Sequence, residues 1–150
     1  MISMSFKGPS LALLIIIFGM FISSLLIINA QMIEKPMVTI TFPDPNQKVK
    51  PGTLTVYGTS SDNALRPCHV TALLNEERPY QNVTATGPEG KDDYSKWTFT
   101  FDPYYSIIKG GQNEIVSRIS CTQTDGTNST SFNKINVTAP QPEVQGNLTQ

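Results

Sequence analysis

The chain begins with one long apolar run. Residues 11–28 (LALLIIIFGMFISSLLII) carry no charged side chain, and Lys7 lies just ahead of them. As a helix, such a run rises about 27 Å, close to the roughly 30 Å hydrocarbon core of a bilayer. A small soluble domain has no use for a helix that is apolar on every side. We therefore expect an export signal or a membrane anchor at this end.

Two interpretations of the run stay open. A cleavable signal has a shorter apolar core and small residues before its cleavage site, whereas the best site here, after Ala30, has a small residue at the last position only. An uncleaved anchor agrees better with the length. In both cases Lys7 stays in the cytoplasm and residues 31–150 are sent outward. The expected location is the cell membrane with the domain outside, or the exterior if the chain is cleaved after Ala30.

Beyond residue 36 the pattern becomes an alternation of apolar and polar residues with period two, which predicts strands with one buried face. Turn-forming Pro, Gly, Asn and Asp residues separate the alternating stretches. Seven short strands in roughly 100 residues predict an all-β, antiparallel sandwich. The expected strands are Val38–Phe42, Thr53–Gly58, Cys68–Ala72, a weak one at Gln81–Thr86, Lys96–Phe101, Asn113–Gln123 and Ser129–Val137.

Two strands carry more specific information. Trp97, Phe99 and Phe101 fall on one face of their strand, so their rings are expected to anchor the core. Phe132 and Ile135 have opposite parity, which predicts either a bulge between them or side chains on opposite faces.

The domain organisation follows from these patterns. Residues 1–30 are expected to be the signal peptide or membrane anchor, 31–36 a linker, 37–139 the sandwich and 140–150 a disordered tail of low apolar density. The chain has 11 Lys and Arg against 12 Asp and Glu, and Lys7 precedes the apolar run, so ten basic residues oppose twelve acidic ones after it. This balance gives no electrostatic footprint for nucleic acid.

Cys68 and Cys121 are the two cysteines of the chain. In an exported protein such a pair indicates a disulfide, because a thiolate metal site would need further ligands. The alternative is two free buried thiols. A bridge would contribute roughly 4 kcal/mol in the chain-entropy treatment.

Four Asn-x-Thr sequons occur in the chain, at Asn82, Asn128, Asn136 and Asn147. In an exported domain they are candidates for N-glycosylation. The alternative is that they are ordinary polar residues of strands and loops.

Other residue types offer little chemistry. His69 alternates outward from Cys68 and Val70, and no motif for a nucleophile accompanies it, so we expect no catalytic residue. Loop aspartates could gather around calcium, but they are common turn formers, and we expect neither a metal site nor a cofactor. These aspartates are Asp44, Asp62, Asp92, Asp93 and Asp125. Tyr94, Tyr104 and Tyr105 could form a ligand platform, or could simply cover one end of the sandwich.

Two stretches resemble the Ig-like domains of bacterial and archaeal surface or secreted proteins. Pro43…Val49…Gly52-x-Leu54-x-Val56-x-Gly58 is similar to their opening strands, and Gly111-x-Asn113-x-Ile115 with Asp125…Asn128 is similar to a later region. Gly126 directly follows Asp125, which departs from the usual spacing. The resemblance covers roughly residues 36–139 and implies an Ig-like sandwich. In the usual strand order Cys68 and Cys121 would then lie on neighbouring strands of one sheet, whereas antibody domains join their two sheets.

The expected function is therefore that of a non-enzymatic, extracytoplasmic, cell-surface Ig-like module that acts in binding, adhesion or envelope architecture. The alternative is a carbohydrate-binding accessory module, and a minimal hydrolase comes third because no acid/base set is present. The expected partners are an envelope protein or glycan and, through residues 11–28, the membrane.

Overall fold

A computed structural model describes residues 35–62 and 67–142. These residues belong to one compact unit, Lys35–Gln150. The apolar run at 11–28, the cleavage site after Ala30, the sequon at Asn147 and most of the proposed tail lie outside the described residues. Within the described residues, no helix is long and apolar enough to span a membrane.

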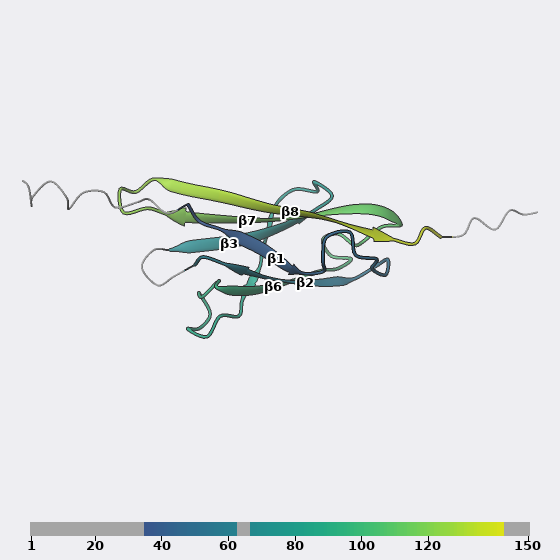
Figure 1. The fold of residues 1–150 in the computed structure, drawn as a ribbon, viewed down its shortest axis with the longest axis horizontal. Coiled ribbons are helices and arrows are strands. Elements are labelled where there is room, and N and C mark those ends of the chain that lie inside the picture. Colours follow the sequence, from purple (N-terminus) through teal and green to yellow (C-terminus); the bar gives the residue numbers. More distant parts are fainter. Residues whose placement is uncertain (1–34, 63–66, 143–150) are drawn as a thin grey trace, which may run out of the picture. The chain divides into compact units, whose positions relative to one another are not determined.

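Two four-stranded antiparallel sheets form the fold, so the all-β sandwich expected from the alternating pattern is confirmed (Figure 1). One sheet has the order β1-β2-β6-β5 and the other has the order β4-β3-β7-β8. The strands are β1 Val38–Phe42, β2 Leu54–Ser60, β3 Cys68–Leu74, β4 Gln81–Asn82, β5 Thr84–Ala85, β6 Lys96–Phe101, β7 Gly111–Thr122 and β8 Asn128–Ala139.

The described residues form eight strands where the pattern predicted seven. The expected strand at Gln81–Thr86 is divided at Val83, so that β4 pairs with β3 in one sheet and β5 pairs with β6 in the other. Val83 itself is buried in the core. The backbone thus crosses from sheet to sheet at one apolar residue, and a two-residue strand on either side is too short to show a pattern of its own.

Strand β6 supplies the centre of the core, as predicted. Trp97 and Phe101 are buried, and Phe99 is half-buried and packs against them from the same face. The ring of Phe99 meets that of Phe101 edge-on, with centroids 5.0 Å apart. Trp97 lies over Gly58 of β2, its partner in the strand register. A Cβ atom at Gly58 would fall 2.0 Å from Cζ2 of Trp97, so only glycine leaves room for this ring.

The β7–β8 hairpin has an unbroken register from Gly111↔Ala139 to Thr122↔Asn128. No bulge therefore separates Phe132 from Ile135. Their opposite parity places Ile135 in the core and leaves Phe132 59% exposed on the outer face. Of the two alternatives left open by the sequence, the structure selects opposite faces.

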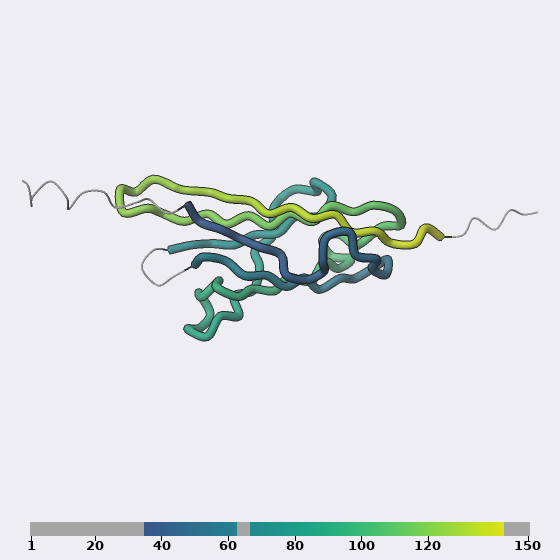
Figure 2. Tube along the Cα trace, viewed as in Figure 1, coloured from purple at the N-terminus to yellow at the C-terminus, as the bar shows by residue number. Residues whose placement is uncertain are grey.

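The start of the domain is held against β8. A register shift between Ile40 and Phe42 turns Phe42 outward, although the plain alternation of β1 placed it with Val38 and Ile40. After this strand, residues 46–49 run beside the end of β8, where Val49 N–H donates to Thr138 O at 2.9 Å. Figure 2 shows the two segments along the same side of the domain.

Candidate binding face

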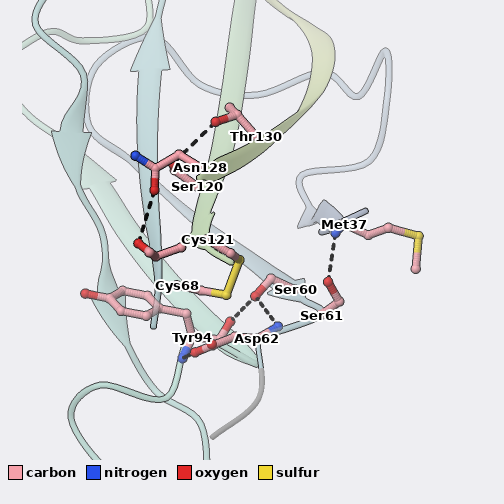
Figure 3. The surroundings of a disulfide bond; sticks show 11 residues. Met37, Ser60, Ser61, Asp62, Cys68, Tyr94, Ser120, Cys121, Asn128 and Thr130 are labelled. Carbon is pink, nitrogen blue, oxygen red and sulfur yellow. Dashed lines mark hydrogen bonds between the residues drawn. A yellow bond between two sulfur atoms is a disulfide. The ribbon is translucent and has the colours of Figure 1, made fainter. Parts of the chain in front are cut away.

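The predicted disulfide is present between Cys68 and Cys121. The two residues lie directly opposite each other in the β3–β7 register, so the bridge joins neighbouring strands of one sheet (Figure 3). Beside it, Asp62 Oδ2 accepts a hydrogen bond from Tyr94 N–H at 2.7 Å, and Ser60 Oγ donates to Tyr94 O at 2.8 Å. The bridge ties the start of β3 to β7, and the two hydrogen bonds tie the end of β2 to the approach to β6.

Three of the four sequons lie within the described residues, all on the β4-β3-β7-β8 sheet. Asn82 is exposed on β4, Asn128 is exposed at the first residue of β8, and Asn136 is half-buried near the end of β8. Their glycosylation stays a prediction.

The three tyrosines proposed as a ligand platform do not come together. Tyr94 precedes β6 and meets His69 edge-on at 5.4 Å, whereas Tyr104 and Tyr105 follow its far end. Tyr104 is fully exposed, while Tyr105 packs on Phe101 and donates a hydrogen bond to Glu77 O. Because a six-residue strand of about 20 Å separates the two groups, they cannot contact one small ligand together.

The remaining candidates are engaged in local structure. His69 Nε2 lies 2.9 Å from Asn82 Oδ1, a side-chain contact across the β3–β4 pair. Asp125 Oδ1 accepts bonds from the backbone and hydroxyl of Thr127, which orders the β7–β8 turn. In residues 35–62 and 67–142, no group of three or more His, Cys, Asp or Glu side chains is arranged to hold a metal ion.

Asp93 orders the loop before β6 and should give the domain an acid-sensitive component of stability. Its carboxylate accepts bonds from Ser95 and from Glu89 N–H, and these bonds lower its pKa below the usual value. A lowered folded-state pKa stabilises the fold above the unfolded-state pKa, and this contribution is lost as the pH falls from about 4 through the folded-state value. Asp93→Asn should therefore flatten the fall in unfolding free energy below about pH 4, as measured by urea titrations across that range. Asp92→Asn, at the exposed neighbour, is the matched control. If the unfolding free energy fell equally below about pH 4 in wild type and in Asp93→Asn, the prediction would be contradicted.

The Gly-x-Asn motif at 111–113 has a structural role. Asn113 is 1% exposed; its Nδ2 donates to Lys109 O and Gly111 O, and its Oδ1 accepts bonds from Lys109 N–H and Asn75 Nδ2. Gly111 has φ +95°, which favours a residue without a Cβ. The amide thus caps the turn into β7 and joins it to the end of β3.

The outer face of the β3-β7-β8 sheet carries an aromatic and apolar strip that we call the outer groove. Leu73 of β3 and Val116 of β7 are directly paired and buried, yet they lie outside the core cluster between the sheets. Tyr80 and Phe132 also line the groove, which encloses about 430 Å³. The groove is therefore separate from the core of the sandwich, and charged side chains line it together with the apolar and aromatic ones: Glu76, Arg78, Glu114 and Lys134.

Charged side chains surround this strip. Arg118 lies over the ring of Tyr80 at 4.4 Å, and Arg78 lies over the same ring at 5.6 Å. Lys134 forms an ion pair of 2.8 Å with Glu114, and the hydrogen bond to Glu114 raises the pKa of Lys134. Aromatic and Arg side chains around an apolar strip have the composition of protein-binding surfaces.

Sequence reasoning missed this groove for an identifiable reason. The sequence did indicate the position of Phe132, because its parity opposes that of Ile135 and a strand without a bulge then turns its ring outward. The sequence did not indicate the position of Tyr80, because this residue lies in the irregular segment between β3 and β4, where no strand period applies. Only the pairing of β3 with β7 and of β7 with β8 brings these residues to one place.

Comparisons with known proteins show no family for this chain. No protein-family model matches the chain, and no curated protein matches it. Among solved structures, an endo-beta-1,4-mannanase from Thermotoga petrophila is similar over 76% of this chain, with 13% identity and a TM-score of 0.49. The match spans 22% of the mannanase chain. This likeness is too distant to say anything of activity.

Proposed function

We propose that this chain is an extracytoplasmic, cell-surface Ig-like module that binds another protein through its outer groove and performs no catalysis. The observation that carries the proposal is the groove itself, which is lined by the exposed Phe132 and the half-buried Tyr80, with the guanidinium of Arg118 over the Tyr80 ring. Such side chains dominate the binding energy of protein interfaces.

The topology supports the Ig-like part of the proposal. The order β1-β2-β6-β5 against β4-β3-β7-β8 corresponds to strands A-B-E-D against C′-C-F-G of Ig-type sandwiches. The bridge between β3 and β7 departs from antibody domains, in which strands of different sheets are joined. The proposed relation is therefore to Ig-like modules in general.

Two features support a place outside the cytoplasm. The apolar run at 11–28 suits export or anchoring, and a disulfide between Cys68 and Cys121 persists in oxidising compartments. The surroundings of His69 support the proposal that the chain performs no catalysis, because its ring contacts Asn82 and Tyr94 rather than a nucleophile. The glycan-binding alternative depended on one tyrosine platform, and its three members are separated, so we do not develop it.

Site-specific photo-crosslinking on intact cells tests this function. A photoreactive phenylalanine analogue at position 132 should capture a protein partner, whereas the same analogue at the exposed Tyr57, on the other sheet, should not. Arg118→Ala should lower the yield at position 132 by about tenfold, because a hot-spot side chain contributes more than about 1 kcal/mol. Protease added to the cells should remove the crosslinked domain.

Three results would overturn the proposal. Equal capture at positions 132 and 57 would show that the groove has no preference for a partner. An unchanged yield with Arg118→Ala would remove the groove from any binding that occurs. Complete protection from protease on cells with an accessible surface would contradict display.

A further inference from the structure

Strand β8 is an edge strand of its sheet, and within the described residues its first half pairs with no strand on the outer side. Of the four edge strands in the described residues, β4 and β5 have two residues each, and β1 has five residues with a register shift. β1 is also capped from outside, since Ile40 N–H donates to Asn133 Oδ1 at 2.9 Å. β8 has twelve residues, no proline and no irregularity in its register. Proteins normally shorten, bend or cover such edges, because their free backbone groups attract further strands.

The existing hydrogen bonds show which backbone groups point outward from β8. Asn136 O accepts a bond from Asn46 N–H at 2.7 Å, and Thr138 N–H donates to Gln47 O at 3.0 Å, so both residues turn their backbone groups away from β7. This direction alternates along an antiparallel strand. Thr130, Phe132 and Lys134 therefore turn their N–H and C=O groups outward as well. Residues 46–49 cover only the end of the strand, so within the described residues no strand is paired with these six groups. β1 contacts β8 in this region, but its printed bond goes to the Asn133 side chain and not to the β8 backbone.

We infer that the free part of β8, Thr130–Lys134, pairs antiparallel with the same segment of a second copy of this chain. This inference goes beyond the proposed function, because it concerns the backbone edge of the sheet, although it shares the Phe132 side chain with the outer groove. A twofold axis at Phe132 places Phe132 against Phe132 and Thr130 against Lys134, so that all six outward groups find partners.

The side chains suit this register. No like charges oppose each other, because each Lys134 faces a threonine. The two Phe132 rings, each 59% exposed in the single chain, would lie side by side as a cross-strand aromatic pair, which is a favourable arrangement in antiparallel sheets. Since the same patch is used on both copies, the assembly closes as a dimer and does not extend into a fibre.

The test uses the full chain in detergent micelles, purified from a host without N-glycosylation. Sedimentation equilibrium should show a change from monomer to dimer as concentration rises. Hydrogen exchange followed by NMR should show that the amides of Thr130, Phe132 and Lys134 gain protection together with the dimer. The intervening amides, which bond to β7, should be protected at all concentrations.

Two sets of variants identify the contact. Thr130→Pro removes an outward N–H and should raise the dimer dissociation constant about tenfold or more, the effect of losing roughly 1.4 kcal/mol. Thr130→Ala loses the same bond from the Thr130 hydroxyl to Ser120 Oγ but keeps the N–H, and should leave the constant within about twofold. Phe132→Asp and Phe132→Lys should each be monomeric alone, because the substituted residue opposes itself, and should form a heterodimer when mixed. Protected β7-facing amides in every variant would establish that each is folded.

Every other outcome overturns the inference. A monomer at all concentrations would exclude self-pairing. A dimer without protection of the three amides would place the contact elsewhere, for example in the groove or in residues 1–34. Protection independent of concentration would mean that the edge is covered by the chain itself. Capture of a different protein at position 132 without self-association would uphold the proposed function and would overturn the inference that β8 pairs with a second copy.

Discussion

Replacing Cys68 and Cys121 together with alanine should lower the free energy of unfolding by roughly 4 kcal/mol. The bridge closes a loop with a sequence separation of 53 residues, which contains β4, β5 and β6 and so passes through both sheets. Without it, the unfolded chain regains the conformations that the loop excludes. Because Cys121 is fully buried, the alanine there also leaves a small void in the core. Urea unfolding at neutral pH measures the difference.

Reduction of the wild-type protein is the matched control, since it breaks the same bond without changing a residue. Reduced wild type and the double variant should unfold at similar urea concentrations, both well below oxidised wild type. An unfolding midpoint that is the same with and without the bridge would contradict the prediction. Free alkylation of both thiols in native protein isolated from cells would remove its premise.

Trp97→Ala should cost about 3–5 kcal/mol, the usual range for removing a large buried aromatic side chain. Trp97 is 1% exposed, and its Nε1–H donates to Thr59 O at 3.2 Å. Truncation opens a cavity between the sheets and leaves that carbonyl without its donor. Tyr57→Ala is the control on the adjacent strand, because this ring is 52% exposed and should change stability by well under half as much.

The contact of Trp97 with Gly58 supplies a second readout. Gly58→Ala should be strongly destabilising in the wild type, because the new methyl group would overlap the indole. It should be less destabilising in the Trp97→Ala background, where the space is empty, and a double-mutant cycle gives the coupling. The carbonyl of Thr39, 2.5 Å from the same Cβ position, should leave part of the penalty. Strict additivity of the two substitutions would show that the indole does not occupy this space.

The alternating pattern was sufficient for most strands because a period of two is a local property. β1 and β6 have the predicted bounds, and β2, β3, β7 and β8 differ by one or two residues at their ends. The inward positions of Trp97, Ile115 and Ile119 followed from the same period. The disulfide was also predicted, because two cysteines in a chain that is expected to be exported have few other uses.

Only the tertiary structure decided how the strands are assembled, because the period says which residues share a face and not which strand lies beside it. The division at Val83 depends on two sheets competing for one short segment, and the outward turn of Phe42 depends on a register shift against β2. Tyr94 is parted from Tyr105 by the length of β6, a separation that no short motif reveals. Likewise, the groove exists because long-range pairing brings Leu73 to Val116, and the free edge exists because residues 46–49 reach only the last part of β8. Local sequence thus determined the strands and their faces, whereas long-range packing determined the surfaces on which the proposed function depends.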